Sequence, residues 1–260
     1  MLDVIALPAF NDNYIWLLRL RGDQRCWVVD PGEAGPVQRY LQAHDLRLEG
    51  VLLTHHHADH IGGVADLAKP GVTLVGSMHD IYRLPPLNVQ VTAGDRFQVL
   101  GNTVQVLEVP GHTLGHIAFY IADQEQPLLF CGDTLFASGC GRLFEGTPEQ
   151  MHASLQSLAQ LPDHTQIFAA HEYTLKNLDF ALQVEPNNSR LQVRQEECQA
   201  KRANQQPTLP SYLELEKATN PFLRVDQPSV IEAAQKRANN SDLQEPAEVF
   251  AILRQWKDSA

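Results

Sequence analysis

The sequence lacks the features that mark several large classes of protein. Its four cysteines form no CxxC pair, which argues against a zinc ribbon and against a disulfide framework, so we expect reduced thiols. The first ten residues contain no basic leader, and no apolar run is long enough to span a bilayer. We therefore expect a cytoplasmic protein that has no membrane partner.

Positive charge is scarce as well. The formal net charge is -11 at pH 7, and basic residues are scattered rather than clustered. An acidic surface repels phosphate groups, so we expect no nucleic-acid partner. The chain is otherwise ordinary, with 43% hydrophobic and 20% charged residues and no low-complexity run, which favours a folded globular protein. We expect it to act as a monomer on a small molecule.

Short apolar runs alternate with helical patterns over the first two thirds of the chain, which is typical of a layered α/β domain. The predicted strands are Tyr14–Leu20, Cys26–Val29, Val51–Leu53, Thr73–Val75, Thr103–Val109, Ile117–Ile121, Leu128–Phe130 and Ile167–Ala170. The predicted helices between them are Pro36–His44, Ile61–Ala68 and Pro148–Leu161.

After His171 the pattern becomes helical and no further strand is predicted. The expected helices are Leu175–Val184, Arg190–Gln206, Ser211–Ala218, Val230–Ala238 and Ala247–Lys257. The fold class is therefore α/β with a smaller all-helical C-terminal domain. We place the catalytic domain at residues 1–172 and the helical domain at residues 173–260.

The densest group of polar side chains follows the predicted strand Val51–Leu53. His55, His57, Asp59 and His60 stand within six residues of one another. If the backbone leaves the strand in an extended conformation, His55 and His57 point the same way because side chains alternate. Asp59 and His60 then face a second point nearby.

More donors stand just after later strands, namely His112, Asp133 and His171. The loops that leave several strands of a layered α/β fold gather at one edge, where binding sites form. A set of five imidazoles and two carboxylates suits zinc, iron or manganese better than calcium or magnesium. The sequence thus predicts a metal-dependent enzyme.

Three further residues are less strongly predicted to act at the metals. We interpret His56 and His116 as structural or supporting residues, because neither shares the spacing of the other histidines. Asp30 follows a predicted strand, where it either orients a ligand through the second ring nitrogen or caps a turn.

The segment Thr54-His55-His56-His57-Ala58-Asp59-His60 resembles the HxHxDH signature of the metallo-β-lactamase superfamily. The resemblance implies an αββα sandwich with two divalent metal ions at its edge, most commonly zinc, with iron or manganese as alternatives. It also implies that His55, His57 and His112 bind one ion, that Asp59, His60 and His171 bind the other, and that Asp133 bridges them.

Other segments are similar to the hydroxyacylglutathione hydrolase (glyoxalase II) family over nearly the whole chain: Asn11–Tyr14, Gly139–Arg142, His171–Thr174, Asn220–Arg224 and Arg254–Lys257. The resemblance implies that the helical domain helps to bind glutathione. It implies substrate contacts from Arg142, Phe144, Tyr173, Arg254 and Lys257. Relatives often have lysine in place of Arg142 and tyrosine in place of Phe144, so the charge is kept here and a hydroxyl is absent.

This family hydrolyses S-(2-hydroxyacyl)glutathione, such as S-D-lactoylglutathione from methylglyoxal detoxification, to glutathione and a 2-hydroxy acid. In the hypothesis that follows, hydroxide from a water shared by the two cations attacks the thioester carbonyl, and Asp59 takes the remaining proton. A glutathione-persulfide dioxygenase with one iron, and a metal-binding protein without activity, are the alternatives. A β-lactamase is less favoured because no leader peptide is present.

Overall fold

The computed structural model describes residues 2–123 and 125–259 of the chain. It forms two compact units that interleave in the sequence. Unit 1 comprises Met1–Glu108 and Gly115–Gly132, and unit 2 comprises Val109–Leu114 and Asp133–Ala260. This division follows spatial contacts, whereas the boundary at residues 172 and 173 separates segments along the sequence and stays a prediction.

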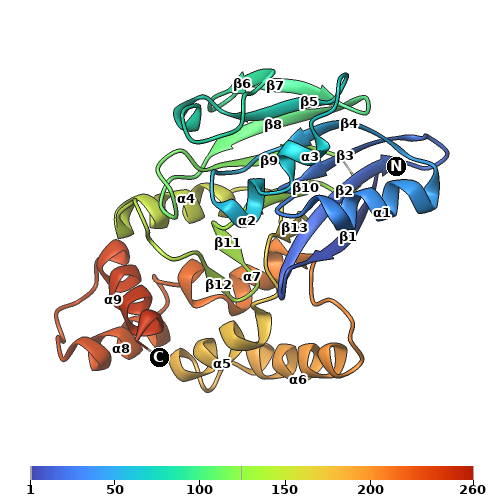
Figure 1. Ribbon diagram of the computed structural model, residues 1–260. Helices are drawn as coiled ribbons and strands as arrows, with labels where there is room; N and C mark the ends of the chain where they lie inside the picture. Colours follow the sequence, from blue (N-terminus) through green and yellow to red (C-terminus); the bar gives the residue numbers. More distant parts are fainter. Residues whose placement is uncertain (1, 124, 260) are drawn as a thin grey trace. The chain divides into compact units, whose positions relative to one another are not determined.

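Unit 1 contains a six-stranded sheet whose strands follow one another in chain order (Figure 1). These strands are β1 (Leu2–Ala9), β2 (Asn13–Leu20), β3 (Arg25–Val29), β4 (Arg47–Leu52), β5 (Thr73–Ser77) and β6 (Val89–Val91). The first three strands are antiparallel, and β3 to β6 are parallel. Strand β1 was not predicted, because Pro8 interrupts its pattern; an edge strand tolerates proline because one side of it donates no ladder bond.

Two helices cover one face of this sheet, α1 (Ala34–His44) and α3 (Val64–Leu67). Val37 of α1 and Val64 of α3 belong to the same apolar cluster as alternate residues of the strands, such as Ile15, Leu17 and Val28. The intervening side chains Trp16 and Leu18 are also buried, which means that a further layer covers the opposite face. Burial of both faces explains why β2 and β3 are apolar throughout.

Four antiparallel strands complete unit 1: β7 (Arg96–Val99), β8 (Asn102–Glu108), β9 (Ile117–Ile121) and β10 (Leu128–Gly132). Every residue of β9 and β10 is buried. The runs predicted at Ile117–Ile121 and Leu128–Phe130 are thus core strands, and the mixed sheets and helices confirm the predicted α/β class.

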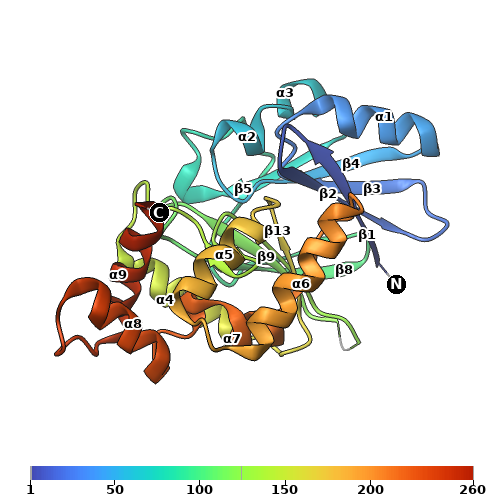
Figure 2. The same ribbon diagram turned by 90° about the horizontal axis from the view of Figure 1, so that it is seen from below.

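Unit 2 is mainly helical from residue 174 onward (Figures 1 and 2). It contains β11 (Leu135–Phe136), β12 (Gly139–Cys140), α4 (Pro148–Ala159), β13 (Gln166–Ala169), α5 (Thr174–Val184), α6 (Ser189–Ala203), β14 (Ser211–Tyr212), α7 (Leu213–Thr219), η2 (Pro221–Leu223), α8 (Pro228–Ala238) and α9 (Pro246–Asp258). The prediction of no strand after His171 was wrong at β14, a two-residue strand that pairs with β13.

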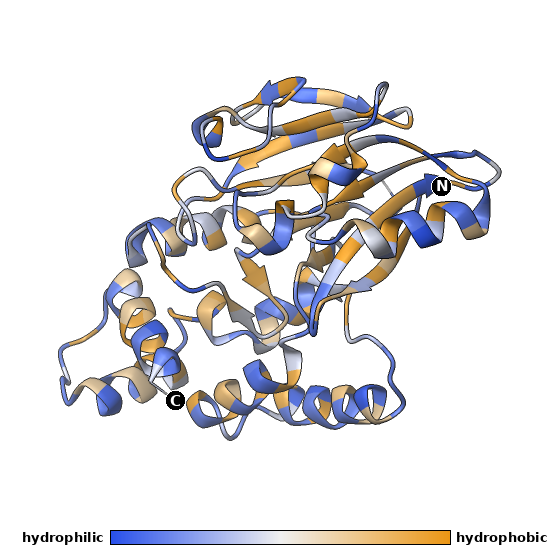
Figure 3. Cartoon of the chain, in the orientation of Figure 1, coloured by the Kyte–Doolittle hydropathy of each residue, from blue (hydrophilic) through white to orange (hydrophobic). Residues whose placement is uncertain are grey.

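Helix α4 begins as the sequence predicts. The Thr147 side chain accepts a hydrogen bond from the Gln150 backbone N–H, and the Gln150 side chain accepts one from the Thr147 backbone N–H. This capping box satisfies two backbone donors of the first turn. The long helices α5 and α6 show both hydrophobic and hydrophilic bands in Figure 3, and they pack together through Leu178, Ala181 and Leu191.

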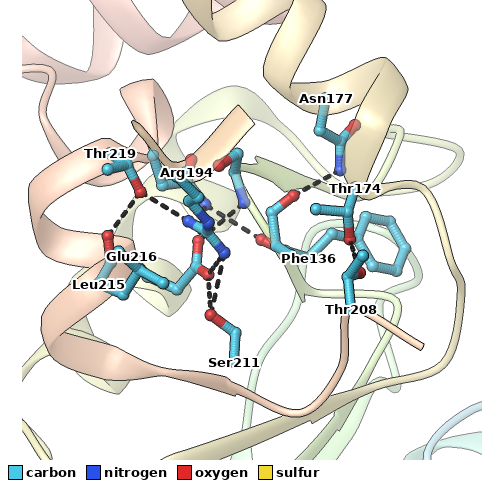
Figure 4. Close-up of polar contacts among 12 residues, drawn as sticks. Phe136, Thr174, Asn177, Arg194, Thr208, Ser211, Leu215, Glu216 and Thr219 are labelled. Atoms are coloured by element: carbon cyan, nitrogen blue, oxygen red, sulfur yellow. Dashed lines mark hydrogen bonds and ion pairs between the residues drawn. The ribbon is translucent and has the colours of Figure 1, made fainter. Parts of the chain in front are cut away.

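A buried ion pair lies among the helices of unit 2 (Figure 4). The Arg194 guanidinium is 2.5 Å from the Glu216 carboxylate, and the two side chains are 4% and 0% exposed. Arg194 also donates to Thr219 at 2.6 Å and to Ser211 at 3.0 Å. The second oxygen of Glu216 accepts the Ser138 backbone N–H at 2.8 Å. These bonds offset the cost of removing both charges from water.

The structure also bears on the expected absence of a membrane partner. Within residues 2–123 and 125–259, no helix combines the length and the apolar character that crossing a bilayer requires.

We expect Glu216→Ala to lower the free energy of unfolding by about 3–5 kcal/mol, because Arg194 then stays buried without its counter-ion. Urea denaturation followed by circular dichroism measures the change. The matched control is Asp163→Ala, which removes the exposed ion pair with Lys217 and should cost less than about 1 kcal/mol. Equal losses in the two variants would contradict the account.

Candidate metal centre

In unit 1 the histidines that follow β4 alternate in direction. His55 Nε2 lies 3.1 Å from His57 Nδ1, so these two rings converge. His56 points elsewhere, and its Nδ1 lies 2.9 Å from a carboxylate oxygen of Asp80. The alternation expected of an extended chain therefore separates His56 from the convergent pair.

Asp30 lies behind the convergent histidines and accepts three hydrogen bonds. They come from the Thr54 backbone N–H at 2.8 Å, the Thr54 hydroxyl at 2.6 Å and His60 Nδ1 at 3.0 Å. Since the Thr54 proton points to Asp30, its oxygen accepts from His55 Nδ1, 3.1 Å away. His55 and His60 are thus both protonated on Nδ1, and Nε2 carries the lone pair that a metal needs.

The donor atoms of Asp30, His55 and His60 lie within 4.8 Å of one another, which is close enough for one cation. We nevertheless place Asp30 behind the ligands, because its oxygens already serve three protein donors. Asp30 orients the two rings, so of the two roles that the sequence left open, ligand orientation is the better supported.

Asp59 and His60 lie in the short helix α2 (Ala58–Ile61), not in a loop. One Asp59 oxygen is 3.5 Å from His60 Nε2 and accepts Asn13 Nδ2 at 3.1 Å. The helix predicted at Ile61–Ala68 is wrong in extent, because the chain breaks between α2 and α3. At Gly63 the backbone is so close to Ala34 that a Cβ atom would lie 2.4 Å from the Ala34 nitrogen.

Unit 2 contains three of the predicted metal ligands, His112, Asp133 and His171, and each is less than 10% exposed. One Asp133 oxygen is 3.3 Å from His112 Nε2, and the other is 3.3 Å from His171 Nε2. His112 Nδ1 donates to the Arg142 carbonyl at 2.8 Å, which leaves Nε2 as the ligand atom. A carboxylate whose two oxygens face two different imidazoles has the geometry of a bridge between two cations.

A glycine permits this close packing around Asp133. A Cβ atom at Gly141 would lie 1.9 Å from the Asp133 carbonyl oxygen and 3.1 Å from His112 Nδ1. The Gly139–Arg142 segment therefore keeps a glycine where the chain passes the two ligands.

His116 is buried and stacks on His55, with ring centroids 4.6 Å apart and an interplanar angle of 17°. This contact fits the supporting role that the sequence predicts. Asn13 and Thr54 also support ligands, and sequence analysis missed both roles. Asn13 lies in the Asn11–Tyr14 segment and Thr54 begins the Thr54–His60 segment, so family resemblance was the available signal for both.

Two of the predicted substrate residues stand against metal-ligand candidates in unit 2. Phe144 is 63% exposed and meets His112 edge to face at 5.2 Å. Tyr173 stacks on His171, with ring centroids 4.6 Å apart. Both aromatic rings therefore lie where a molecule bound at these histidines would meet them.

The three predicted cations of unit 2 gather around one carboxylate. Arg254 donates to Asp258 at 2.9 Å and to the Cys140 carbonyl at 2.9 Å, and Arg142 lies 3.6 Å from Asp258. Arg254 is only 4% exposed, so it does not lie on a solvated helix face. With one anion among three cations, the cluster is positive although the whole chain is acidic.

Lys257 is the third cation of this cluster, and its ammonium donates to Asn177 Oδ1. Burial, followed by the positive charge of Arg254, lowers the pKa of Lys257 to about 7. Arg142 lowers this pKa as well, while Cys140 and Asp258 raise it. Lys257 therefore changes charge in the physiological range, which an exposed lysine does not.

Comparison with known proteins connects both units to one family. Residues 10–171 match the model of the metallo-β-lactamase superfamily, and residues 172–260 match the model described as hydroxyacylglutathione hydrolase C-terminus. A hydroxyacylglutathione hydrolase of Pseudomonas paraeruginosa is 54% identical over 260 residues, 99% of each chain. These matches agree with the resemblance seen in the motifs.

Solved structures confirm the predicted metallo-β-lactamase fold. ETHE1 from Myxococcus xanthus is 25% identical, covers 100% of this chain and 99% of its own, and aligns with a TM-score of 0.64. TTHA1623 in a di-iron-bound form is 26% identical, covers 85% of this chain and 100% of its own, and has a TM-score of 0.59.

We expect Asp30→Asn to weaken metal binding about 10–100-fold, because an amide has a single accepting oxygen and cannot accept from both the Thr54 N–H and His60 Nδ1. Competition with a chromophoric chelator measures the affinity. The control is Asp80→Asn, which alters the carboxylate beside His56 and should leave the affinity near that of the unaltered protein. Equal metal affinity in Asp30→Asn and the unaltered protein would refute the orienting role.

Proposed function

The chain belongs to the hydroxyacylglutathione hydrolase family of the metallo-β-lactamase superfamily, and from this membership we propose that it hydrolyses S-(2-hydroxyacyl)glutathione. The products are glutathione and a 2-hydroxy acid, which is D-lactate when the substrate is S-D-lactoylglutathione. The observation that carries this function is 54% identity over 99% of both chains to a curated relative of that name. The reaction is the second step of methylglyoxal detoxification.

We propose that seven side chains within the metallo-β-lactamase match would bind two divalent cations. His55, His57 and His112 bind one ion, Asp59, His60 and His171 bind the other, and Asp133 bridges them. Support comes from the two Asp133 oxygens, each 3.3 Å from a different histidine, and from a family match over residues 10–171 that includes all seven residues. We propose zinc as the usual metal, although iron and manganese accept the same donors.

A pair of such cations provides Lewis acidity and lowers the pKa of a shared water from about 15.7 toward 7. In our proposal Asp59, which Asn13 orients through one oxygen, would accept a proton from the water that attacks the thioester carbonyl. The departing thiol has a pKa of about 8.5, so the thiolate leaves without a strong general acid.

Glutathione carries carboxylates, and we propose that the positive cluster of Arg142, Arg254 and Lys257 binds them. Arg254 contributes a fixed positive charge, and two of its N–H groups already donate to the Cys140 carbonyl and to Asp258. Tyr173 and Phe144 then flank the part of the substrate nearest to His171 and His112. The match over residues 172–260 supports a glutathione-binding role for the helical domain at residues 173–260.

The same comparison weighs against the alternatives. A dioxygenase with one iron or a metal-binding protein without activity is less well supported than the hydrolase, because full-length relatives share the C-terminal domain. We also propose that the enzyme is a cytoplasmic monomer without nucleic-acid partners. Four cysteines that are buried and form no disulfide agree with a reducing compartment.

We expect the purified protein to hydrolyse S-D-lactoylglutathione and to lose this activity when a chelator removes the metals. Loss of thioester absorbance follows the reaction, and metal analysis of the same samples reports their content. Restoring zinc should restore turnover. A sample shown to contain two metal ions per chain but unable to cleave the thioester would contradict the proposed substrate.

We expect KM to rise about tenfold between pH 6 and pH 8, because Lys257 loses its proton as pH passes through its pKa of about 7. Only the protonated amine attracts a carboxylate, so the low-KM form prevails below pH 7. Steady-state kinetics across this range measure the change.

The control for this pH profile is Lys257→Arg, whose guanidinium stays charged throughout the range. Its KM should vary little between pH 6 and pH 8. A KM of the unaltered enzyme that is equally flat would show that the charge of Lys257 does not contribute to binding.

A further inference from the structure

The hairpin formed by β11 and β12 connects two functional regions of unit 2. Asp133 stands just before Leu135, where the hairpin begins, and Arg142 stands just after Cys140, where it ends. Side chains from the helical region hold its turn (Figure 4). Glu216 accepts the Ser138 N–H at 2.8 Å, and Asn220 Nδ2 donates to the carbonyls of Phe136 at 3.2 Å and Gly139 at 2.9 Å.

Asn177 of helix α5 also contacts this turn. Its Nδ2 donates to the Ala137 carbonyl at 2.9 Å, and its Oδ1 accepts from the Lys257 ammonium. A carbonyl can only accept and an ammonium can only donate, so the amide has one possible orientation. The side chain is 3% exposed, which excludes water as a substitute partner for most of its surface.

Gly139 provides independent evidence that the position of this amide is fixed. A Cβ atom on Gly139 would lie 2.5 Å from Asn177 Nδ2 and 2.7 Å from its Cγ. The amide therefore lies directly over the hairpin backbone, and a side chain at position 139 would displace it. The fit between a glycine and an amide fixes the distance between the hairpin and helix α5.

Among the neutral groups described around Lys257, the Asn177 amide is the one that accepts a hydrogen bond from the ammonium. Its Nζ lies 5.4 Å from the ring centroid of Phe180 and 5.8 Å from that of Phe222. Two cations, Arg254 and Arg142, repel it, and one carboxylate, Asp258, attracts it. The Asn177 carbonyl therefore sets where the ammonium lies among like charges.

We propose that Asn177 is a positioning residue that fixes the Lys257 ammonium against the β11–β12 hairpin and thereby sets the affinity for the substrate's carboxylate. This inference rests on the proposed function, in which Lys257 binds that carboxylate. It predicts an effect on KM rather than kcat. The hairpin keeps its bonds to Glu216 and Asn220 when Asn177 is removed, so Asp133 stays in place.

The test is a double-mutant cycle in the metal-loaded, full-length enzyme with S-D-lactoylglutathione as substrate. We expect Asn177→Ala to raise KM about tenfold and to change kcat by less than about threefold, as for the loss of a charge-assisted hydrogen bond. Lys257→Ala should raise KM at least as much. If Asn177 acts through Lys257, the double variant has the KM of Lys257→Ala alone.

Two further variants separate positioning from a loss of stability. Asn188→Ala removes an amide that also donates to a backbone carbonyl, that of Ala218 at 3.0 Å, and accepts from a backbone N–H, but it does not contact Lys257. Its KM should equal that of the unaltered enzyme. Gly139→Ala displaces the Asn177 amide without removing it, so it should raise KM as Asn177→Ala does. It provides a second test if Asn177→Ala folds poorly.

The outcomes distinguish this inference from the function on which it rests. An unchanged KM in Asn177→Ala would overturn the positioning role, and so would KM effects of the two single variants that multiply in the double variant. In either case a raised KM in Lys257→Ala would still support Lys257 as part of the substrate site. An unchanged KM in Lys257→Ala would remove the carboxylate site itself, and the inference with it. Equal effects of Asn177→Ala and Asn188→Ala on KM would show a structural cause.

Discussion

Asp133 is a buried carboxylate whose two oxygens each lie 3.3 Å from the Nε2 atom of a different histidine. A buried anion is costly unless positive charge or hydrogen bonds offset it. His112 donates its other nitrogen to the Arg142 carbonyl, so both ring nitrogens of this residue have defined partners. Cations bound by Asp133 and these imidazoles would supply the compensating positive charge. The need to hold the carboxylate for such cations accounts for the close packing of Gly141 and the fixed loops around Asp133.

Charged groups behind the predicted metal ligands are also held by several hydrogen bonds each. In unit 1, Asp30 sets the ring orientation of His60 directly and that of His55 through Thr54. In unit 2, the buried Arg194–Glu216 pair holds the hairpin turn at Ser138, close in sequence to Asp133. Each of these charged groups is satisfied by several hydrogen bonds, so each has little freedom to move. Rigid supporting groups keep ligands oriented before a metal or substrate arrives.

Local patterns in the sequence predicted a large part of this arrangement. The alternation of His55 and His57, the donors placed after strands, and the start of helix α4 at Pro148 all depend on near neighbours in the chain. The break at Gly63 was missed, because it depends on the approach of a distant backbone near Ala34.

Contacts between side chains far apart in the sequence were also beyond prediction. Asn177 meets a lysine 80 residues later, and Glu216 meets a backbone 78 residues earlier. Such pairs leave no periodic trace in a single sequence. Burial of Arg254 was missed for the same reason, since its partner, the Cys140 carbonyl, lies 114 residues away.

We propose that His55, His57, Asp59, His60, His112 and His171 would bind two metal ions, with Asp133 as the ligand that both ions share. A crystal structure of the metal-loaded protein, with anomalous diffraction recorded at the metal absorption edge, tests it most directly. The account predicts two anomalous peaks about 3.5–4 Å apart, with one Asp133 oxygen at each. A single peak, or two peaks that do not share Asp133 as a ligand, would contradict the proposal.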